Sequence, residues 1–390
     1  MLDFKANPTP LFFTCLASWL TVIDISKIVK TPLLHLAFES LFSDVLFDAV
    51  VDFIVSMFRE TRDVYNNTSS IKYLYDELYA LGPKLGTLDN SDPDVFQGIS
   101  RIYVEAGEAW VVLIAQQPEM YEFIVRAVAQ CTEYNEDLEV TKTTFNFWYE
   151  LTQLITVDKH RRAKELFAPI YSGLVDTMIK HLHYPEGRDR TDIFKADRVA
   201  EDKFRDFRYE MGDVLKDCCR VVGGSASLHK ATFLVRQKLE DQRCGVPVRW
   251  QDFEAPLFSM RLMAREVDTE SKVVADVMKL LVSLPEHDEI RYAATLVLGR
   301  YTEWTAKHPE YLEYQLSYIS SGFDRQSKDV ISAAAQALKH FCQDCKKVYS
   351  STDRFTEISI WSIMLLSCIH SIGTSLQRLT SSPSLKSLKV

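Results

Sequence analysis

Two stretches, IRYAATLVLGRYTEW (290–304) and ISAAAQALKHFCQDC (331–345), decide the fold class. Placed over each other at an offset of 41 residues, they align apolar and small side chains. The aligned pairs are Ile290–Ile331, Ala293–Ala334, Ala294–Ala335 and Val297–Leu338. These positions lie three or four residues apart, which is the spacing of one helix face. A period near 40 residues with two helices in each unit is typical of HEAT or armadillo-like solenoids.

The same helical periodicity extends outward through most of the chain. Residues 42–57 put their apolar side chains on one face, and 111–131 does so in two pieces that break at Pro118. Further helices are expected at 140–157, 161–183, 204–222, 226–242, 250–267, 271–283, 288–305, 309–320 and 328–347. Strand-like alternation is nearly absent. The sequence therefore predicts an all-α fold, a right-handed HEAT-repeat solenoid of paired antiparallel helices at 1–348, followed by a divergent Ser/Thr-rich tail at 349–390.

Composition and charge exclude several classes of protein. The 390 residues contain 45 Lys and Arg against 54 Asp and Glu, so the formal net charge is −9. Because phosphate neutralisation requires a basic surface, this balance argues against direct nucleic-acid binding and favours basic protein partners. The low content of glycine, 13 residues, argues against phosphate-cradling enzymes and against all-β folds rich in tight turns.

The cysteines and the two uncharged segments bear on the compartment. Eight scattered cysteines and a start, MLDFK, without a basic n-region indicate a reducing compartment, the cytosol or nucleus. Residues 6–23 are uncharged but contain Pro8 and Pro10, and we expect a core helix there. Residues 358–377 are also uncharged and precede a basic tail, yet hydroxyl side chains dilute them. No membrane insertion is expected, although a tail anchor at 358–377 is the alternative.

No catalytic, cofactor-binding or metal-binding residues are predicted, and the chain is expected not to be an enzyme. Phosphate-loop, dinucleotide-binding and nucleophile-elbow sequences are missing, and the nine histidines are dispersed. Cys342 and Cys345 form a single CxxC without the second pair that a structural zinc site needs, so core packing is the preferred interpretation, as for Cys218 and Cys219. The aromatic run 145–149 favours core packing too; a groove for aromatic peptide side chains is its alternative.

A charged segment from Tyr184 to Asp202 interrupts the helical pattern and is expected to be a loop. Its acidic residues are Glu186, Asp189, Asp192, Asp197, Glu201 and Asp202. Arg188, Arg190, Lys195 and Arg198 lie among them. One interpretation is a solvated connector of mixed charge. The other is an insertion that reaches a basic partner from the rim of the solenoid.

Several stretches resemble the transportin-SR branch of the importin-β superfamily, including its fungal mRNA-transport-regulator members. They are WLTVIDI (19–25), FNFWYEL (145–151), FRDFRYEMGDVLKD (204–217), IRYAATLVLGRYTEW (290–304) and AAAQALKHFCQDC (333–345). The resemblance runs in the same order and with similar spacing from about residue 12 to about residue 348.

This resemblance implies a HEAT-repeat receptor without cofactors that carries cargo through nuclear pores. Such receptors bind cargo in the cytoplasm, release it when Ran-GTP binds in the nucleus, and contact Phe-Gly nucleoporins. The cargo of this branch consists of basic, Arg/Ser-rich RNA-binding proteins. Related receptors use an acidic loop in their middle repeats near Ran or cargo, which makes the six acidic residues of 186–202 the candidate contacts.

The resemblance also has gaps. It implies that the N-terminal repeats with the main Ran-binding surface, and the C-terminal repeats that mainly hold Arg/Ser-rich cargo, lie outside this sequence. The tail from about Tyr349 fits the family poorly. A truncated or misjoined gene model and a genuine short isoform are both open explanations, and a generic helical scaffold without Ran dependence is the alternative function.

Overall fold

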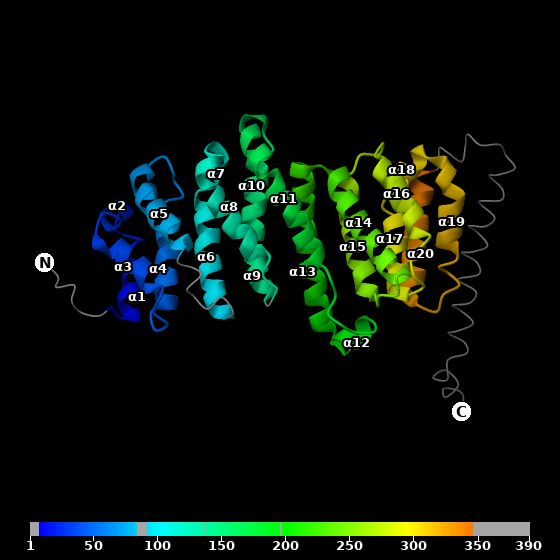
Figure 1. The fold of residues 1–390 in the computed structure, drawn as a ribbon, viewed down its shortest axis with the longest axis horizontal. Coiled ribbons are helices and arrows are strands. Elements are labelled where there is room, and N and C mark those ends of the chain that lie inside the picture. The colour runs from blue at the N-terminus through cyan, green and yellow to red at the C-terminus, as the bar shows by residue number, and fades with distance from the viewer. Residues whose placement is uncertain (1–7, 84–91, 136, 196, 346–390) are drawn as a thin grey trace, which may run out of the picture. The chain divides into compact units, whose positions relative to one another are not determined.

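The structure is a computed structural model of the chain (Figure 1). The residues it describes are 8–83, 92–135, 137–195 and 197–345. Every regular element in these ranges is a helix, which confirms the all-α prediction. The predicted tail at 349–390, with the uncharged segment 358–377, lies outside the described residues. Within the described ranges, no helix is both long and apolar enough to cross a membrane.

The helices form two compact units, and each is a two-layered stack of helix pairs. The first comprises Met1–His181 with Arg205–Val222, and the second comprises Leu182–Phe204 with Gly223–Val390. The division passes through the long helix α13 (Arg198–Val222), whose first turns belong to the second unit. Paired helices with buried facing stripes are what the predicted HEAT-like repeats require.

In the first unit, one layer holds α4 between α1 and α6, with α10 beside α6. The other layer places α3 against α5 and α8 against α11. The bounds are α1 (Pro10–Trp19), α2 (Ile25–Ile28), α3 (Pro32–Ser40), α4 (Phe47–Arg59), α5 (Thr68–Leu81), α6 (Pro93–Ala109), α7 (Val111–Gln116), α8 (Pro118–Thr132), α9 (Leu138–Thr143), α10 (Phe145–Ile155) and α11 (Arg161–His181). Phe13 and Leu16 of α1 are buried, so the core helix predicted within 6–23 is confirmed.

In the second unit, α15, α17 and α20 pack side by side as one layer. The helix α14 packs on α15 and α16, and α19 packs on α17 and α20. The bounds are α12 (Arg190–Phe194), α14 (Gly224–Arg243), α15 (Trp250–Met263), α16 (Lys272–Leu281), α17 (Asp288–Leu298), α18 (Thr302–Lys307), α19 (Leu312–Ser320) and α20 (Lys328–Asp344). Short 3-10 turns at Asp158–His160, Ala264–Glu266 and Pro309–Tyr311 adjoin helix ends in the two units.

The repeat between α17 and α20 is real, but its register differs by one residue from the predicted offset of 41. Ala335 is exposed, whereas Ala334 is buried like Ala294. An offset of 40 therefore matches the two buried stripes. Each residue turns a helix by about 100°, so a one-residue error exchanges a buried position for an exposed one. The two helices also approach closely, since a Cβ on Gly299 would lie 2.9 Å from the Cα of Ala337.

Two predicted helices are divided in the structure. The helix expected at 140–157 is interrupted at Thr144, whose buried hydroxyl donates to the carbonyl of Thr141 and accepts from the hydroxyl of Thr132. The helix expected at 288–305 ends at Leu298, and α18 starts after a turn in which the Tyr301 hydroxyl donates to the carbonyl of Met260. Buried polar groups that find partners at these turns offset the lost helical hydrogen bonds.

Candidate partner-binding site

The charged segment 184–202 is more ordered than the predicted loop. It contains the one-turn helix α12 and the beginning of α13, which starts at Arg198 rather than near Phe204. The carboxylate of Asp197 accepts hydrogen bonds from the backbone N–H groups of Val199 and Ala200, which supplies the N-terminal cap of α13. Sequence periodicity could not place this helix start because the first turn of α13 contains no buried residue, and its one large apolar side chain, Val199, is exposed.

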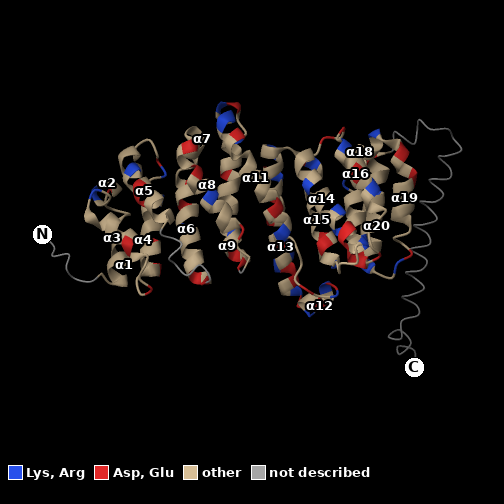
Figure 2. Ribbon diagram, in the orientation of Figure 1, with Lys and Arg blue, Asp and Glu red and all other residues tan. Residues whose placement is uncertain are grey.

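The six candidate acidic residues have different local roles. Asp189 caps α12 by accepting from the N–H of Asp192, whose own carboxylate accepts from the N–H of Arg188. Glu186 forms an exposed ion pair with Arg249, at 2.6 Å. Glu201 lies 4.0 Å from Arg190, and Asp202 is exposed in the first turn of α13. The structure therefore does not gather the six carboxylates into one patch, and Figure 2 shows basic and acidic residues interspersed around α12.

One basic residue of the segment, Arg190, points toward α17 and α20. Its Nε lies 2.8 Å from a carboxylate oxygen of Glu289, and its Nη2 pairs with Asp329. Its guanidinium carbon lies 5.1 Å from the ring centroid of Tyr292, a distance suited to a cation–π contact. We call Glu201, Glu289, Asp329 and Tyr292 the arginine cradle. In the sequence, nothing distinguishes Arg190 from the other basic residues of the predicted loop.

The cradle is half-enclosed, and its charges are strongly coupled. The side chains of Arg190 and Glu289 are 19% and 13% exposed. Burial lowers the pKa of Arg190, but the Glu289 and Asp329 carboxylates outweigh burial and hold this pKa above its ordinary value. Burial raises the pKa of the Glu289 carboxyl, and Arg190 opposes that rise. The buried carboxylate of Glu254 adds to the negative potential at Glu289.

The start of the segment is anchored on the first turn of α15. The indole N–H of Trp250 donates to the carbonyl of Gly187, and the Gln251 amide donates to the carbonyls of Pro185 and Gly187. The Tyr184 ring packs against Trp250, at 5.5 Å between centroids. Gly187 is required for close packing, because a Cβ there would lie 2.4 Å from the side chain of Ile193.

Together these contacts tie the segment to three successive helices. It meets α15 through Trp250, α17 through Glu289 and α20 through Asp329, each within the first turn of its helix. Repeats in a solenoid ordinarily touch only their neighbours. This segment is an exception, because Arg190 also bonds to residues of α17 and α20 that lie 99 and 139 positions further along the chain.

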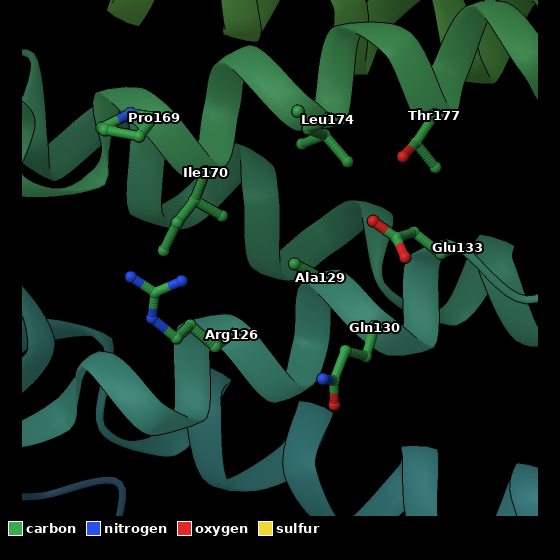
Figure 3. A pocket seen from close by; sticks show the side chains of 9 residues that line it. Arg126, Ala129, Gln130, Glu133, Pro169, Ile170, Leu174 and Thr177 are labelled. Carbon is green, nitrogen blue, oxygen red and sulfur yellow. The ribbon is translucent and has the colours of Figure 1, made fainter.

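A second candidate surface lies on α5, α8 and α11 of the first unit. The rings of Tyr75 and Tyr79 stack at 6.0 Å, and Phe123 of α8 meets both edge-on. Beside them, a pocket of about 290 Å³ opens between α8 and α11. Its lining residues are Arg126, Ala129, Gln130, Glu133, Pro169, Ile170, Gly173, Leu174 and Thr177 (Figure 3). We call this combined surface the outer aromatic face.

The other residues singled out in the sequence are mostly core. Phe147 and Trp148 are buried and Phe145 stacks on Phe207 of α13, so core packing is confirmed for these three, while Tyr149 is 55% exposed. Cys218, Cys219 and Cys345 are buried, and burial raises the pKa of the Cys218 thiol. Among the described residues, no group of His, Cys, Asp and Glu could hold a metal ion.

Comparisons with known families match three parts of the sequence. Residues 91–181 match the second TPR domain of transportin-3 and importin-13, and residues 271–356 match the third TPR domain of the same proteins. Residues 6–54 match the exportin 1-like family. The second-domain match precedes the third-domain match along the chain.

Relatives and solved structures agree with these matches. The chain is 46% identical to the uncharacterized protein C11G11.07 of Schizosaccharomyces pombe and 40% identical to the mRNA transport regulator MTR10 of Saccharomyces cerevisiae. Each alignment covers 86% of this chain, so the chain spans only about a third of the length of these relatives (36% and 35%). Transportin MOS14 of Arabidopsis thaliana is 28% identical over 85% of the chain and 36% of its own length.

Two solved structures share the fold at low sequence identity. Importin-13 in its cytosolic state has a TM-score of 0.72 and 17% identity, covering 95% of this chain and 46% of its own. Kap121p bound to RanGTP has a TM-score of 0.58 and 15% identity, covering 98% of this chain and 36% of its own. At these identities the likeness concerns the fold, and it agrees with the predicted HEAT-repeat solenoid.

Proposed function

We propose that the chain is part of a nuclear transport receptor, a karyopherin, of the transportin-SR branch of the importin-β family that its sequence resembles. The observation that carries the proposal is the 40–46% identity to the two fungal relatives, one of them named an mRNA transport regulator. The receptor would bind cargo, pass through nuclear pores and move between cytoplasm and nucleus. Its mechanism would be binding without catalysis.

For the cargo, we propose basic, Arg/Ser-rich RNA-binding proteins, released when Ran-GTP binds. The net charge of −9 supports a basic partner, because opposite charge speeds association and favours the matching surface. RanGTP is bound by Kap121p, a protein of the same fold. The six acidic residues between Glu186 and Asp202 stay our candidate contacts with Ran or cargo. Of the six, Glu186, Asp192, Asp197 and Asp202 are exposed.

The experiment is a binding assay with the purified chain. A labelled Arg-Ser repeat peptide is titrated with and without Ran loaded with a non-hydrolysable GTP analogue. Binding of the peptide that weakens in the presence of Ran-GTP supports the receptor. If the affinity for the peptide is the same with and without Ran-GTP, the alternative function, a helical scaffold, is favoured. A triple variant, Asp192→Asn, Asp197→Asn and Asp202→Asn, that binds both partners as the wild type does would remove the charged segment from the proposal.

For Phe-Gly nucleoporins, we propose the outer aromatic face. Partly exposed aromatic rings beside a pocket lined by Ile170, Leu174 and Pro169 suit an incoming phenyl ring. Ile170→Asp puts a charge into the pocket and should reduce binding of a Phe-Gly repeat peptide at least fivefold. The matched control Val157→Asp changes an exposed apolar residue away from the pocket and should leave binding unchanged. Equal affinities for the two variants would contradict this placement.

A further inference from the structure

We propose that the arginine cradle is a binding subsite for an arginine side chain of a basic partner, and that Arg190 occupies it as an internal competitor in the free protein. This inference rests on the proposed function for its class of partner, a protein rich in arginine. It adds to that function a defined subsite and an intramolecular occupant that controls access to it.

The present occupant identifies the chemistry of the subsite. Arg190 sends two different nitrogen atoms to two different carboxylates, Nε to Glu289 and Nη2 to Asp329. The ring of Tyr292 lies against its guanidinium. A planar, forked cation satisfies both carboxylates and the ring together, whereas the ammonium of lysine is a point charge without a flat face. The cradle therefore selects arginine over lysine.

The cradle and its occupant come from elements of different rigidity. Glu289 and Asp329 lie in the first turns of α17 and α20, where the helix N-terminus stabilises a carboxylate. These helices pack against each other through buried stripes. Arg190, in contrast, begins the one-turn helix α12, which has no buried residue. Departure of Arg190 would leave the carboxylates in place.

An emptied cradle would require another cation. Glu289 is 13% exposed, Glu254 adds negative potential at its carboxyl, and Asp329 pairs with the same guanidinium, so loss of Arg190 would leave like charges near one another without their shared cation. An arginine from a partner removes this repulsion. Tyr184 also packs against Phe194 of α12, so displacement of Arg190 would break this ring contact, whereas the hydrogen bond from Trp250 of α15 to Gly187 can persist.

The test compares matched pairs of variants for binding of an Arg-Ser repeat peptide, measured by fluorescence anisotropy. Arg190→Gln empties the cradle, and Arg188→Gln removes the same charge from an exposed neighbour. Glu289→Gln weakens the cradle, and Glu286→Gln removes the same charge from an exposed residue of the preceding turn. Circular dichroism confirms that each variant keeps its helical content.

We expect Arg190→Gln to bind the peptide about tenfold more tightly than Arg188→Gln. The reason is that the Arg190 side chain no longer competes with the peptide for the cradle, and about tenfold corresponds to the loss of one charge-assisted hydrogen bond. We expect Glu289→Gln to bind it about tenfold more weakly than Glu286→Gln. A Lys-Ser peptide should lose most of this discrimination. Hydrogen exchange of α12 in the wild type should rise when the Arg-Ser peptide is added, because the segment is displaced.

Two results would overturn the inference. One is equal binding within both matched pairs, which places the arginine site elsewhere while leaving the receptor proposal intact if Ran-GTP still releases the peptide. The other is an α12 whose exchange does not change when the peptide binds. Failure of the whole proposed function gives a different pattern, because then neither the wild type nor Arg190→Gln responds to Ran-GTP.

Discussion

Each unit contains a cluster of arginine–carboxylate ion pairs, and the two clusters differ in which charge is buried. In the first unit, the buried carboxylate of Glu105 on α6 lies 2.8 Å from Arg59 and 3.0 Å from Arg62, two exposed arginines at the end of α4. In the arginine cradle of the second unit, the cation is inside and Asp329 and Glu201 are the more exposed partners. Glu105 joins two long helices, whereas Arg190 joins one short segment to a stable layer.

The difference teaches which ion pairs hold the fold and which can be exchanged. Separating Glu105 from its arginines requires α4 and α6 to part, and these two helices pack closely against each other. Separating Arg190 from its cradle requires only the one-turn helix α12 to move, and α12 contains no fully buried residue. We therefore assign the Glu105 cluster to stability and the arginine cradle to binding.

The largest expected effect is that of Glu105→Ala. The variant removes a buried acceptor of two charge-assisted hydrogen bonds, so the free energy of unfolding should fall by about 3 kcal/mol. Urea denaturation followed by circular dichroism measures it. Glu60→Ala is the matched control, because it removes an exposed carboxylate beside the same arginines and should change stability by less than about 0.5 kcal/mol. A similar loss in both variants would mean that general charge balance, not the buried pair, matters.

A smaller effect on stability is expected for Arg190→Gln, less than about 1 kcal/mol, because α12 can detach and let water reach the cradle. The local effect should be larger. Hydrogen exchange at 188–195 should speed up about tenfold while α17 and α20 keep their protection. If this variant instead destabilises the protein as much as Glu105→Ala, the cradle is a structural element and the contrast between the two clusters disappears.

The two clusters also differ in how far the sequence could predict them. Hydrogen bonds between side chains of neighbouring repeats join residues about one period apart: Glu105 is 46 and 43 positions from its two arginines, and Trp110 is 49 from Thr61. Arg190 is 99 and 139 positions from Glu289 and Asp329. A repeat near 40 residues thus predicts contacts such as those of Glu105, between residues about one period apart. It does not predict the contacts of Arg190 with α17 and α20.

The fold itself was largely predictable, for a physical reason. Residues such as Ile290, Ala293 and Val297 recur at helical spacing because one face must be buried, and that pattern is written in the sequence. The register of the repeat was not predictable, because the three consecutive alanines Ala333-Ala334-Ala335 do not show which of them is buried. The helix α12 escaped prediction because it is one turn long and is set by the cap at Asp189 rather than by apolar residues.

The smallest expected effect on stability concerns Glu108, one turn beyond Glu105 on α6. Here removal of the charge should stabilise the protein instead of destabilising it. Burial raises the pKa of the Glu108 carboxyl, the charges of Glu105 and Glu150 add to the rise, and the amide of Asn146 and the charge of Arg62 oppose it. A carboxyl with a raised pKa in the folded state favours folding below its ordinary pKa, and it loses that contribution as pH rises through the folded value.

Glu108→Gln should therefore be slightly more stable than the wild type at pH 7, by less than about 1 kcal/mol, and the advantage should vanish near pH 4. Asn146→Ala provides the opposite test. It removes the hydrogen bond, 3.0 Å long, that favours the charged form of Glu108, so it should lower stability at pH 7 and little at pH 4. Urea denaturation at the two pH values measures both variants. If Glu108→Gln is less stable than the wild type at pH 7, Glu108 contributes to the buried cluster as Glu105 does, and the arginines of α4 hold two carboxylates in place rather than one.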